Sequence, residues 1–204
     1  MEDELAPAVD RTVDPHRERD LRLVGRARAG DLDAFNELVV HYQDHLVGLA
    51  MRITGDVEAA HDAVQEAFIR AYRNLPAFRG DSFRAWLVRI AVNTSTDVLR
   101  LRKRRPSEPY PEREDEAWEP PAGASADPEA EAVRRARSRV LSTALGSLSD
   151  GQRAAIILYD VEGYDYPEIA RITGVSLGTV KSRIHRGRLA MRELLADSME
   201  LFRE

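Results

Sequence analysis

Residues 165–188 read DYPEIARITGVSLGTVKSRIHRGR, and they predict two helices joined by a tight turn. Asp165 and Glu168 have the spacing of a capping box, in which each side chain accepts a backbone N–H at the start of the first helix. Gly174 is placed to end that helix, and Ser176 is placed to cap the next one. A short helix, a glycine turn and a longer helix together form a helix-turn-helix pattern.

The second helix of this pair is strongly basic, because no acidic residue interrupts it before Glu193. Such a helix can enter the major groove of DNA, where arginine and lysine read guanine edges or contact phosphates. Thr179 and Ser182 lie near its start, where recognition helices contact bases. The alternative is an ordinary helical hairpin with a solvated basic face, but the turn, the cap and the density of basic side chains favour DNA binding. Those side chains, with one histidine, are Lys181, Arg183, His185, Arg186, Arg188 and Arg192.

Three more helices are predicted in the first half of the chain, because apolar residues recur there every three or four positions. The apolar stripes fall within residues 35–49, 57–75 and 83–98. Asp31 and Asp56 each follow a glycine and are placed to cap a helix. No stretch keeps the two-residue period of a strand for long enough, so the chain is predicted to be all-α.

Residues 106–133 separate the two helical halves and are predicted to form a flexible, acidic, proline-rich linker. Residues 1–16 are predicted to be a disordered N-terminal tail. Two small helical domains are therefore expected, over residues 17–105 and 134–204. The helices predicted early in the second half run over Val133–Leu145 and, after a Ser149 cap, Gln152–Val161.

The overall charge first argues against a nucleic-acid binder, because 35 acidic residues outnumber 30 basic ones and the pI is about 5.6. Divided along the chain, the net charge is 0 for residues 1–105, −8 for 106–133 and +3 for 134–204. The acidic excess thus lies in the linker, and the second half is basic. The sequence has no cysteine, no apolar run of bilayer length and no secretion signal, so we expect a cytoplasmic protein without membrane insertion.

A second group of candidate residues closes the first half, where FRGDSFRAW (residues 78–86) precedes a basic helix end. Aromatic residues between basic ones suit single-stranded nucleic acid, because bases stack and phosphates are neutralised. For Phe83 and Trp86, however, the spacing favours an ordinary place in the core. The basic cluster at Arg100–Arg105 fits a DNA contact and a solvated helix end equally well.

A third group is a polar stripe, since Asp62, Glu66 and Arg70 recur every four residues and Gln65 lies beside them. This stripe could dock on a basic partner helix, although spacing alone favours a salt-bridged surface. No phosphate-binding loop, nucleophile motif or catalytic carboxylate pair is present, so we expect no enzymatic activity and no cofactor. A metal site at His41 and His45 is disfavoured because the zincin arrangement and cysteine ligands are both missing.

The order of three motifs resembles one known family. DAVQEAFIRAY (residues 62–72), WLVRIAVN (86–93) and GTVKSRIHRGR (178–188), with an acidic linker between the halves, resemble the extracytoplasmic-function (ECF) sigma factors of the sigma-70 family. The resemblance implies sigma domain 2 over residues 20–105 and sigma domain 4 over residues 134–198. It also implies a non-enzymatic factor that directs core RNA polymerase to promoters and helps to melt the minus-ten element.

The resemblance further implies a role for each group of residues. The docking face for the clamp helices of the polymerase β′ subunit would comprise Asp62, Gln65, Glu66 and Arg70. The minus-ten contacts would comprise Phe78, Arg79, Gly80, Asp81, Ser82, Arg89, Asn93, Arg100, Arg102, Lys103 and Arg104. The minus-thirty-five contacts would comprise Thr179, Lys181, Ser182, Arg183, His185, Arg186 and Arg188.

The implied partners are core RNA polymerase, through its β′ clamp helices and β flap, promoter DNA in duplex and single-stranded form, and an anti-sigma factor. Two other functions stay open on the residues alone. One is an autonomous helix-turn-helix regulator that binds duplex DNA without polymerase. The other is a helical enzyme or scaffold that uses the face of His41 and His45.

Overall fold

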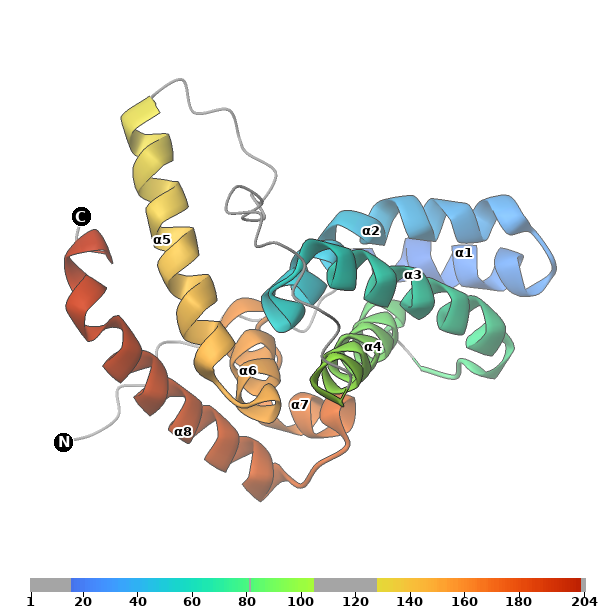
Figure 1. Cartoon of the computed structure of the whole chain (residues 1–204). Helices are drawn as coiled ribbons and strands as arrows, with labels where there is room; N and C mark the ends of the chain where they lie inside the picture. Colours follow the sequence, from blue (N-terminus) through green and yellow to red (C-terminus); the bar gives the residue numbers. More distant parts are fainter. Residues whose placement is uncertain (1–15, 81, 105–127, 203–204) are drawn as a thin grey trace.

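The computed structural model describes residues 16–80, 82–104 and 128–202, and these ranges form helices without any strand (Figure 1). The predicted all-α class is therefore confirmed. None of the helices in these ranges combines the length and apolarity needed to cross a membrane. Most of the predicted tail and linker lies outside the described residues, as does Asp81.

The described part of the first half, residues 16–80 and 82–104, contains four helices and one short 3₁₀ turn. Their bounds are α1 Arg17–Arg28, α2 Leu32–Thr54, α3 Val57–Asn74, η1 Leu75–Ala77 and α4 Phe83–Arg104. Asp31 and Asp56 cap α2 and α3 as predicted, by accepting the backbone N–H of Ala34 at 3.1 Å and of Ala59 at 2.7 Å. Gly55 lies between α2 and α3 with a φ of 72°, which turns the chain sharply between the two helices.

In the second half, the described residues 128–202 form four α-helices with a π-helical turn and a final 3₁₀ segment. Their bounds are α5 Pro128–Ser147, α6 Asp150–Ile156, η2 Ile157–Val161, α7 Tyr166–Thr173, α8 Leu177–Leu195 and η3 Ala196–Phe202. The predicted capping box of α7 is present, with Asp165 and Glu168 accepting each other's backbone N–H at 2.7 and 2.9 Å. Gly174 follows with a φ of 69°, and Ser176 caps α8. The helix-turn-helix predicted for residues 165–188 is thus formed.

Two helices of the second half differ in detail from the prediction. Helix α5 begins at Pro128 rather than Val133, so the last six residues of the predicted linker are helical. A proline is well accommodated at the first position of a helix, and Glu131 pairs with Arg134 at 2.6 Å and with Arg135 at 3.3 Å. The helix predicted over Gln152–Val161 begins two residues early and ends in the π-helical turn η2.

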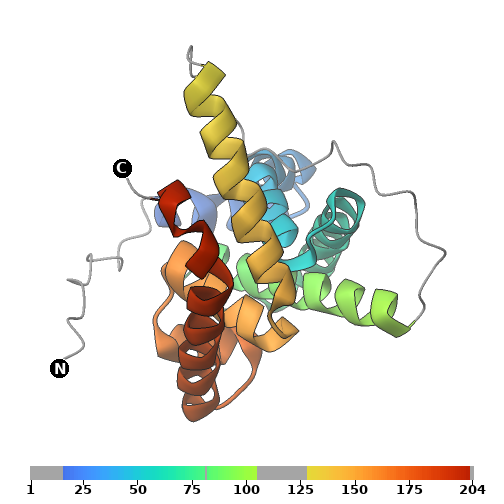
Figure 2. The same cartoon turned by 60° about the vertical axis from the view of Figure 1, so that its left-hand side comes forward.

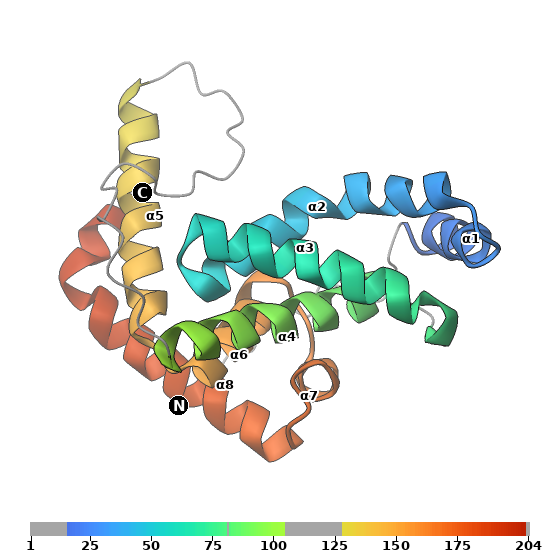
Figure 3. The ribbon, with the colours of Figure 1, turned by 45° about the vertical axis from the view of Figure 1, so that its right-hand side comes forward.

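The two halves share one contiguous hydrophobic core, and this contact between the two predicted domains was not predicted from the sequence. Side chains of α2, α3 and α4 form one part of it, and side chains of α6, α7 and α8 form the other. Helix α7 lies against α4, as Figure 3 shows. The buried Arg153 of α6 donates to the carbonyl oxygen of Ile53 at the end of α2, at 2.7 Å.

Candidate functional site

The polar stripe of α3 faces solvent. The opposite side of the helix carries small side chains and packs closely on α2 and α4. Asp62 and Gln65 are exposed. Glu66 accepts a hydrogen bond from Arg70 at 2.6 Å, and Arg70 lies 3.5 Å from Asp97 of α4. The hydrogen bond to Glu66 raises the pKa of Arg70 above its ordinary value, although burial opposes it. The small buried residues that allow the close packing are Ala59, Ala60, Ala63, Ala67 and Ala71.

The loop before α4 is built around Phe78, whose side chain is buried. Its ring centroid lies 5.2 Å from that of Trp86 and 6.0 Å from that of Phe83. A Cβ atom on Gly80 would come within 3.1 Å of the Phe78 ring, so glycine permits this close packing. Phe78 therefore supports the loop from beneath, and its ring does not face solvent where the resemblance placed a DNA contact.

Arg28 of α1 holds the same loop, a role that no pattern in the sequence predicts. Its guanidinium donates to the carbonyl oxygen of Leu75 at 3.0 Å and to that of Phe78. It also lies 5.7 Å from the centroid of the Phe78 ring. No local pattern links Arg28 to residues almost fifty positions away, so periodicity carried no signal for this contact.

The exposed part of the loop consists of Arg79 and Gly80 among the described residues. The Arg79 guanidinium donates to the carbonyl oxygen of Pro76 at 2.5 Å, which folds it back over the turn. Ser82 accepts the backbone N–H of Ala85 at 3.2 Å and so caps α4. The predicted minus-ten residue Ser82 thus has a structural partner, which the sequence analysis did not foresee.

Helix α4 presents Arg89, Asn93 and Arg100 on its exposed side. Arg100 lies 3.7 Å from Asp97 on the same helix. Arg102 pairs with Asp56, the residue that caps α3, at 2.9 Å. Lys103 and Arg104 belong to α4, but their side chains lie outside the described part of the chain.

Helix α8 has one buried side and one exposed, basic side. Val180, Ile184 and Gly187 are buried, and a Cβ atom on Gly187 would come within 2.8 Å of Cγ1 of Ile156 on α6. Glycine at this position therefore allows α8 and α6 to pack closely. The exposed predicted DNA contacts on this helix are Lys181, His185, Arg186 and Arg188.

Several predicted minus-thirty-five residues also make contacts within the chain. The Thr179 hydroxyl lies 2.9 Å from the Ser176 hydroxyl at the start of α8, and Arg186 donates to the Ser182 hydroxyl at 2.5 Å. The Arg183 guanidinium lies over Gly151 of α6, where a Cβ atom would come within 2.8 Å of its central carbon.

Arg188 makes two contacts with η2. It forms an ion pair with Asp160 and lies 4.9 Å from the centroid of the Tyr159 ring. The hydrogen bond to Asp160 raises the pKa of Arg188, although burial opposes it. Arg188 thus links α8 to η2.

The two histidines considered for a metal site have different partners. His41 lies within 3.3 Å of Arg19, and its ring also contacts that of His16 in a T-shaped arrangement. His45 pairs with Glu162 of the second half at 2.7 Å. Across the described ranges, no three potential ligands gather closely enough to hold a metal ion.

Glu162 is almost fully buried between the halves. Burial alone raises its pKa, but the hydrogen bond from His45 and the charges of His45, Arg84 and Arg52 outweigh burial and bring the pKa below the ordinary 4.5. Glu162 is therefore an ionised carboxylate at neutral pH.

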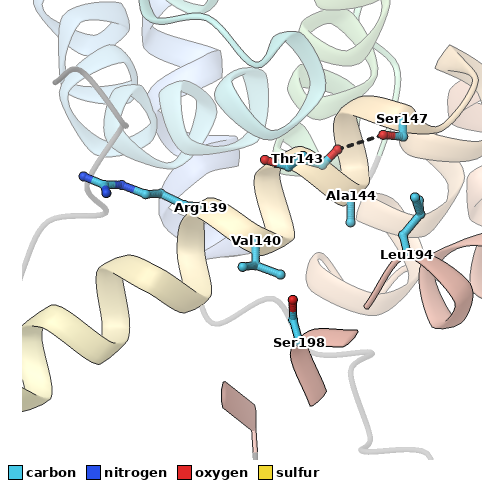
Figure 4. Close-up of a pocket in the computed structure, with 7 residues that line it drawn as sticks. All are labelled: Arg139, Val140, Thr143, Ala144, Ser147, Leu194 and Ser198. Carbon is cyan, nitrogen blue, oxygen red and sulfur yellow. Dashed lines mark hydrogen bonds between the residues drawn. The ribbon is translucent and has the colours of Figure 1, made fainter. Parts of the chain in front are cut away.

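A shallow groove of about 260 Å³ lies between α5 and the end of α8 (Figure 4). Figure 2 shows these helices side by side, with η3 returning toward α5. Leu141 of α5, together with Leu194 and Met199, leaves apolar surface exposed in the same part of the molecule. The lining residues are Arg139, Val140, Thr143, Ala144, Ser147, Leu194 and Ser198.

Comparison with known proteins assigns both halves to one family. The model of Sigma-70 region 2 matches residues 38–105, and the model of Sigma-70, region 4 matches residues 138–191. The RNA polymerase sigma-H factor of Pseudomonas aeruginosa is 39% identical over 183 residues, which cover 88% of this chain and 95% of that relative.

Two further comparisons agree. The ECF RNA polymerase sigma-E factor of Escherichia coli strain K12 is 42% identical over 175 residues, covering 83% of this chain and 90% of that relative. A solved structure of the sigma factor RpoE in complex with the anti-sigma factor NepR from Bartonella quintana has a TM-score of 0.60 and 29% identity. The likeness covers 79% of this chain and 96% of that one.

Proposed function

We propose a division of labour within the chain from one premise: this chain belongs to the sigma-70 family and is an ECF RNA polymerase sigma factor. It directs core polymerase to particular promoters and helps to open the minus-ten region. Region 2 supplies polymerase docking and the minus-ten contacts, and region 4 supplies the minus-thirty-five contacts.

Polymerase docking is assigned to the exposed stripe of α3, formed by Asp62, Gln65, Glu66 and Arg70. Two observations support this assignment. The stripe is exposed, and the alanine residues on the opposite side of the helix pack α3 closely against α2 and α4. The partner is the clamp-helix coiled coil of the β′ subunit. A second contact, with the β flap, is assigned to the apolar groove between α5 and α8.

The minus-ten contacts are assigned to Arg79, Gly80 and Ser82 in the loop and to Arg89 and Asn93 on α4. Flipping a base out of the duplex costs a few kcal/mol, which capture of the base and binding of the strand must offset. Phe78 holds the loop in place because its ring is buried. Arg100, Arg102, Lys103 and Arg104 then neutralise the adjacent backbone, and Asp81 stays a predicted loop contact outside the described residues.

The minus-thirty-five contacts are assigned to the first turns of α8. Lys181, His185 and Arg186 are exposed there and can reach the major groove. Thr179, Ser182, Arg183 and Arg188 complete the surface. The ion pair between Arg188 and Asp160 is consistent with a positioning contribution as well as a phosphate contact.

The observation that carries this function is the presence of two different exposed surfaces in one chain. An autonomous helix-turn-helix regulator needs only the basic face of α8, whereas a sigma factor also needs the polar stripe of α3. An anti-sigma partner is proposed because the structurally similar RpoE is held by the anti-sigma factor NepR. The chain acts where the polymerase acts, in the cytoplasm.

Run-off transcription with purified core polymerase across a promoter library tests the proposal. Transcripts should arise from a subset of promoters with shared minus-ten and minus-thirty-five sequences, and only when this chain is added. Transcription that is independent of the chain, or of the promoter sequence, would contradict it.

A further inference from the structure

A charged network joins the two halves at Glu162, the residue that follows η2. Its side chain is 4% exposed, and it pairs with His45 of α2 at 2.7 Å and with Arg84 of α4 at 3.2 Å. The Arg84 guanidinium also lies 5.8 Å from the ring centroid of Tyr164. One carboxylate of region 4 is therefore held by a histidine and an arginine of region 2, and we call His45, Arg84 and Glu162 the latch.

Arg153 of α6 makes a second connection between the two halves. Its guanidinium donates to the carbonyl oxygens of Leu145 and Gly146 in the last turn of α5, at 2.7 and 2.6 Å. It also donates to that of Ile53 in the last turn of α2, at 2.7 Å. Carbonyl groups at helix ends lack partners within the helix, so Arg153 caps one helix from each half.

These contacts hold the halves together but can be released. A carboxylate that is buried without its ion-pair and hydrogen-bond partners is strongly destabilised, which favours the closed arrangement while water is excluded. On separation, the latch residues regain water, and Arg153 keeps its carbonyl partners at the end of α5. An interface with this polar content is expected to separate more readily than a purely apolar core.

The closed arrangement is too small to span a promoter. The minus-ten and minus-thirty-five elements lie about 25 base pairs apart, which is about 85 Å at ~3.4 Å per base pair. A compact chain of this length has a radius of gyration of about 17 Å and is roughly 45 Å across. The chain between Arg104 and Pro128 can reach at most about 80 Å, so the two halves can span the elements only after they separate.

The closed arrangement leaves the predicted DNA contacts exposed. Arg89 and Asn93 on α4, and Lys181 and Arg186 on α8, are all exposed in it. Closure therefore acts on the distance between the two surfaces and does not cover either of them.

We propose that the latch of His45, Arg84 and Glu162 holds the free chain closed, and that polymerase must open it before both promoter elements can be bound. The proposal rests on the assignment of one promoter element to each half. The stability of the latch then sets how much of the free chain is competent for initiation, because only the open fraction can bind productively.

A distance measurement on the whole chain tests the latch. The sequence has no cysteine, so Asn36→Cys on α2 and Glu193→Cys on α8 provide two unique labelling sites on exposed residues. Pulsed electron–electron double resonance between spin labels at the two cysteines then reports the distance distribution in the free protein. Circular dichroism checks that each variant keeps its helical content.

Glu162→Lys is the main variant, because it removes the carboxylate that His45 and Arg84 contact and places a cation against Arg84. Arg84→Glu is the second, and it sets a carboxylate against Glu162 from a partly exposed position. Asp160→Lys is the matched control, since it reverses a charge two residues away in an ion pair that lies entirely within region 4.

The free wild-type chain and Asp160→Lys should show one short, narrow distance population. Glu162→Lys and Arg84→Glu should transfer a substantial fraction to longer, broader distances without loss of helix. A broad distribution in the wild-type chain would overturn the proposal. So would latch variants that keep their helices and give the wild-type distribution.

A transcription assay distinguishes failure of the latch from failure of the proposed function. With core polymerase and one active promoter, Glu162→Lys should reach half-maximal transcript yield at a chain concentration about threefold lower or more than wild type. An unchanged requirement would contradict the latch alone. No transcript from either chain would contradict the proposed function, while the distance measurement would still report on the latch.

Discussion

Gly187 shows how one missing side chain sets the packing of helix α8 against α6. A Cβ atom there would come within 2.8 Å of Cγ1 of Ile156, an atom in the buried part of the isoleucine side chain. Alanine ordinarily stabilises a helix by about 1 kcal/mol relative to glycine. At this position the clash is the larger effect, because the core beneath is closely packed.

Gly187→Ala should therefore lower the free energy of unfolding by about 1–3 kcal/mol, measured by urea denaturation. Gly178→Ala on the same helix is the control, because its Cβ would meet only the Ser176 hydroxyl at 3.9 Å. That variant should be neutral or stabilised by up to ~1 kcal/mol. Equal changes in both variants would show that helix propensity, and not the Ile156 contact, sets the stability.

Arg186 is expected to read a base rather than only a phosphate. Arg186→Ala should cost about 1–3 kcal/mol at a single promoter position, measured by competition among promoters that differ by one base pair. Arg192→Ala, also exposed on α8 but farther from its start, should leave base preference unchanged. A uniform loss across all promoters after Arg186→Ala would argue for a phosphate contact.

At this scale, the sequence predicted local contacts and missed distant ones. Asp31, Asp165 and Ser176 cap helices as predicted, because a cap depends on residues three positions apart. Arg28 and Glu162 contact residues about fifty or more positions away. No periodicity in the sequence records such contacts.

Among the helices, α3 carries the most direct test of polymerase docking. Glu66→Lys should abolish binding to core polymerase, because it reverses the charge of the exposed stripe. The fold should survive, since an exposed ion pair such as Glu66–Arg70 is worth about 0.2–1 kcal/mol. A pull-down with core enzyme, together with circular dichroism, measures both effects.

Glu58→Lys provides the matched charge reversal on α3, about one turn before Asp62 and two turns before Glu66. It should bind core polymerase normally. Normal binding by Glu66→Lys, or equal loss in both variants, would remove the support for a specific docking face.

Apart from α1, for which no apolar stripe was identified, the helices were predicted better than their ends and their packing. All three stripes of the first half and the helix-turn-helix form where the apolar spacing placed them. The early start of α5 escaped prediction because proline and acidic residues also mark a linker. The π-helical turn η2 has no signature in the apolar spacing, since it changes only the hydrogen-bond register.

For the whole molecule, the net charge of −5 is misleading until it is divided along the chain. The exposed basic face of α8 and the acidic segment before α5 belong to the same chain and carry opposite charges. Weak binding to bulk DNA is therefore expected for the free protein, because phosphate contacts dominate nonspecific affinity. The shared core of the two halves was not predictable, since each half has its own complete apolar pattern.

The length of chain between the halves should matter more for initiation than for DNA contact. Deleting residues 106–121 leaves a segment that reaches at most about 30 Å, too short for both promoter elements. Run-off yield should fall strongly, while binding of a minus-thirty-five duplex by the polymerase complex should fall less. A Gly/Ser segment of the original length is the control for length, and yield unaffected by the deletion would refute a spanning role.

The central claim is that this chain reads promoters only as part of a polymerase complex. Fluorescence anisotropy with labelled promoter DNA, with and without core polymerase, measures this directly. The account predicts sequence-specific binding when both proteins are present and only weak, salt-sensitive binding by the chain alone. Tight, sequence-specific binding to duplex promoter without polymerase would contradict it and would identify an autonomous regulator.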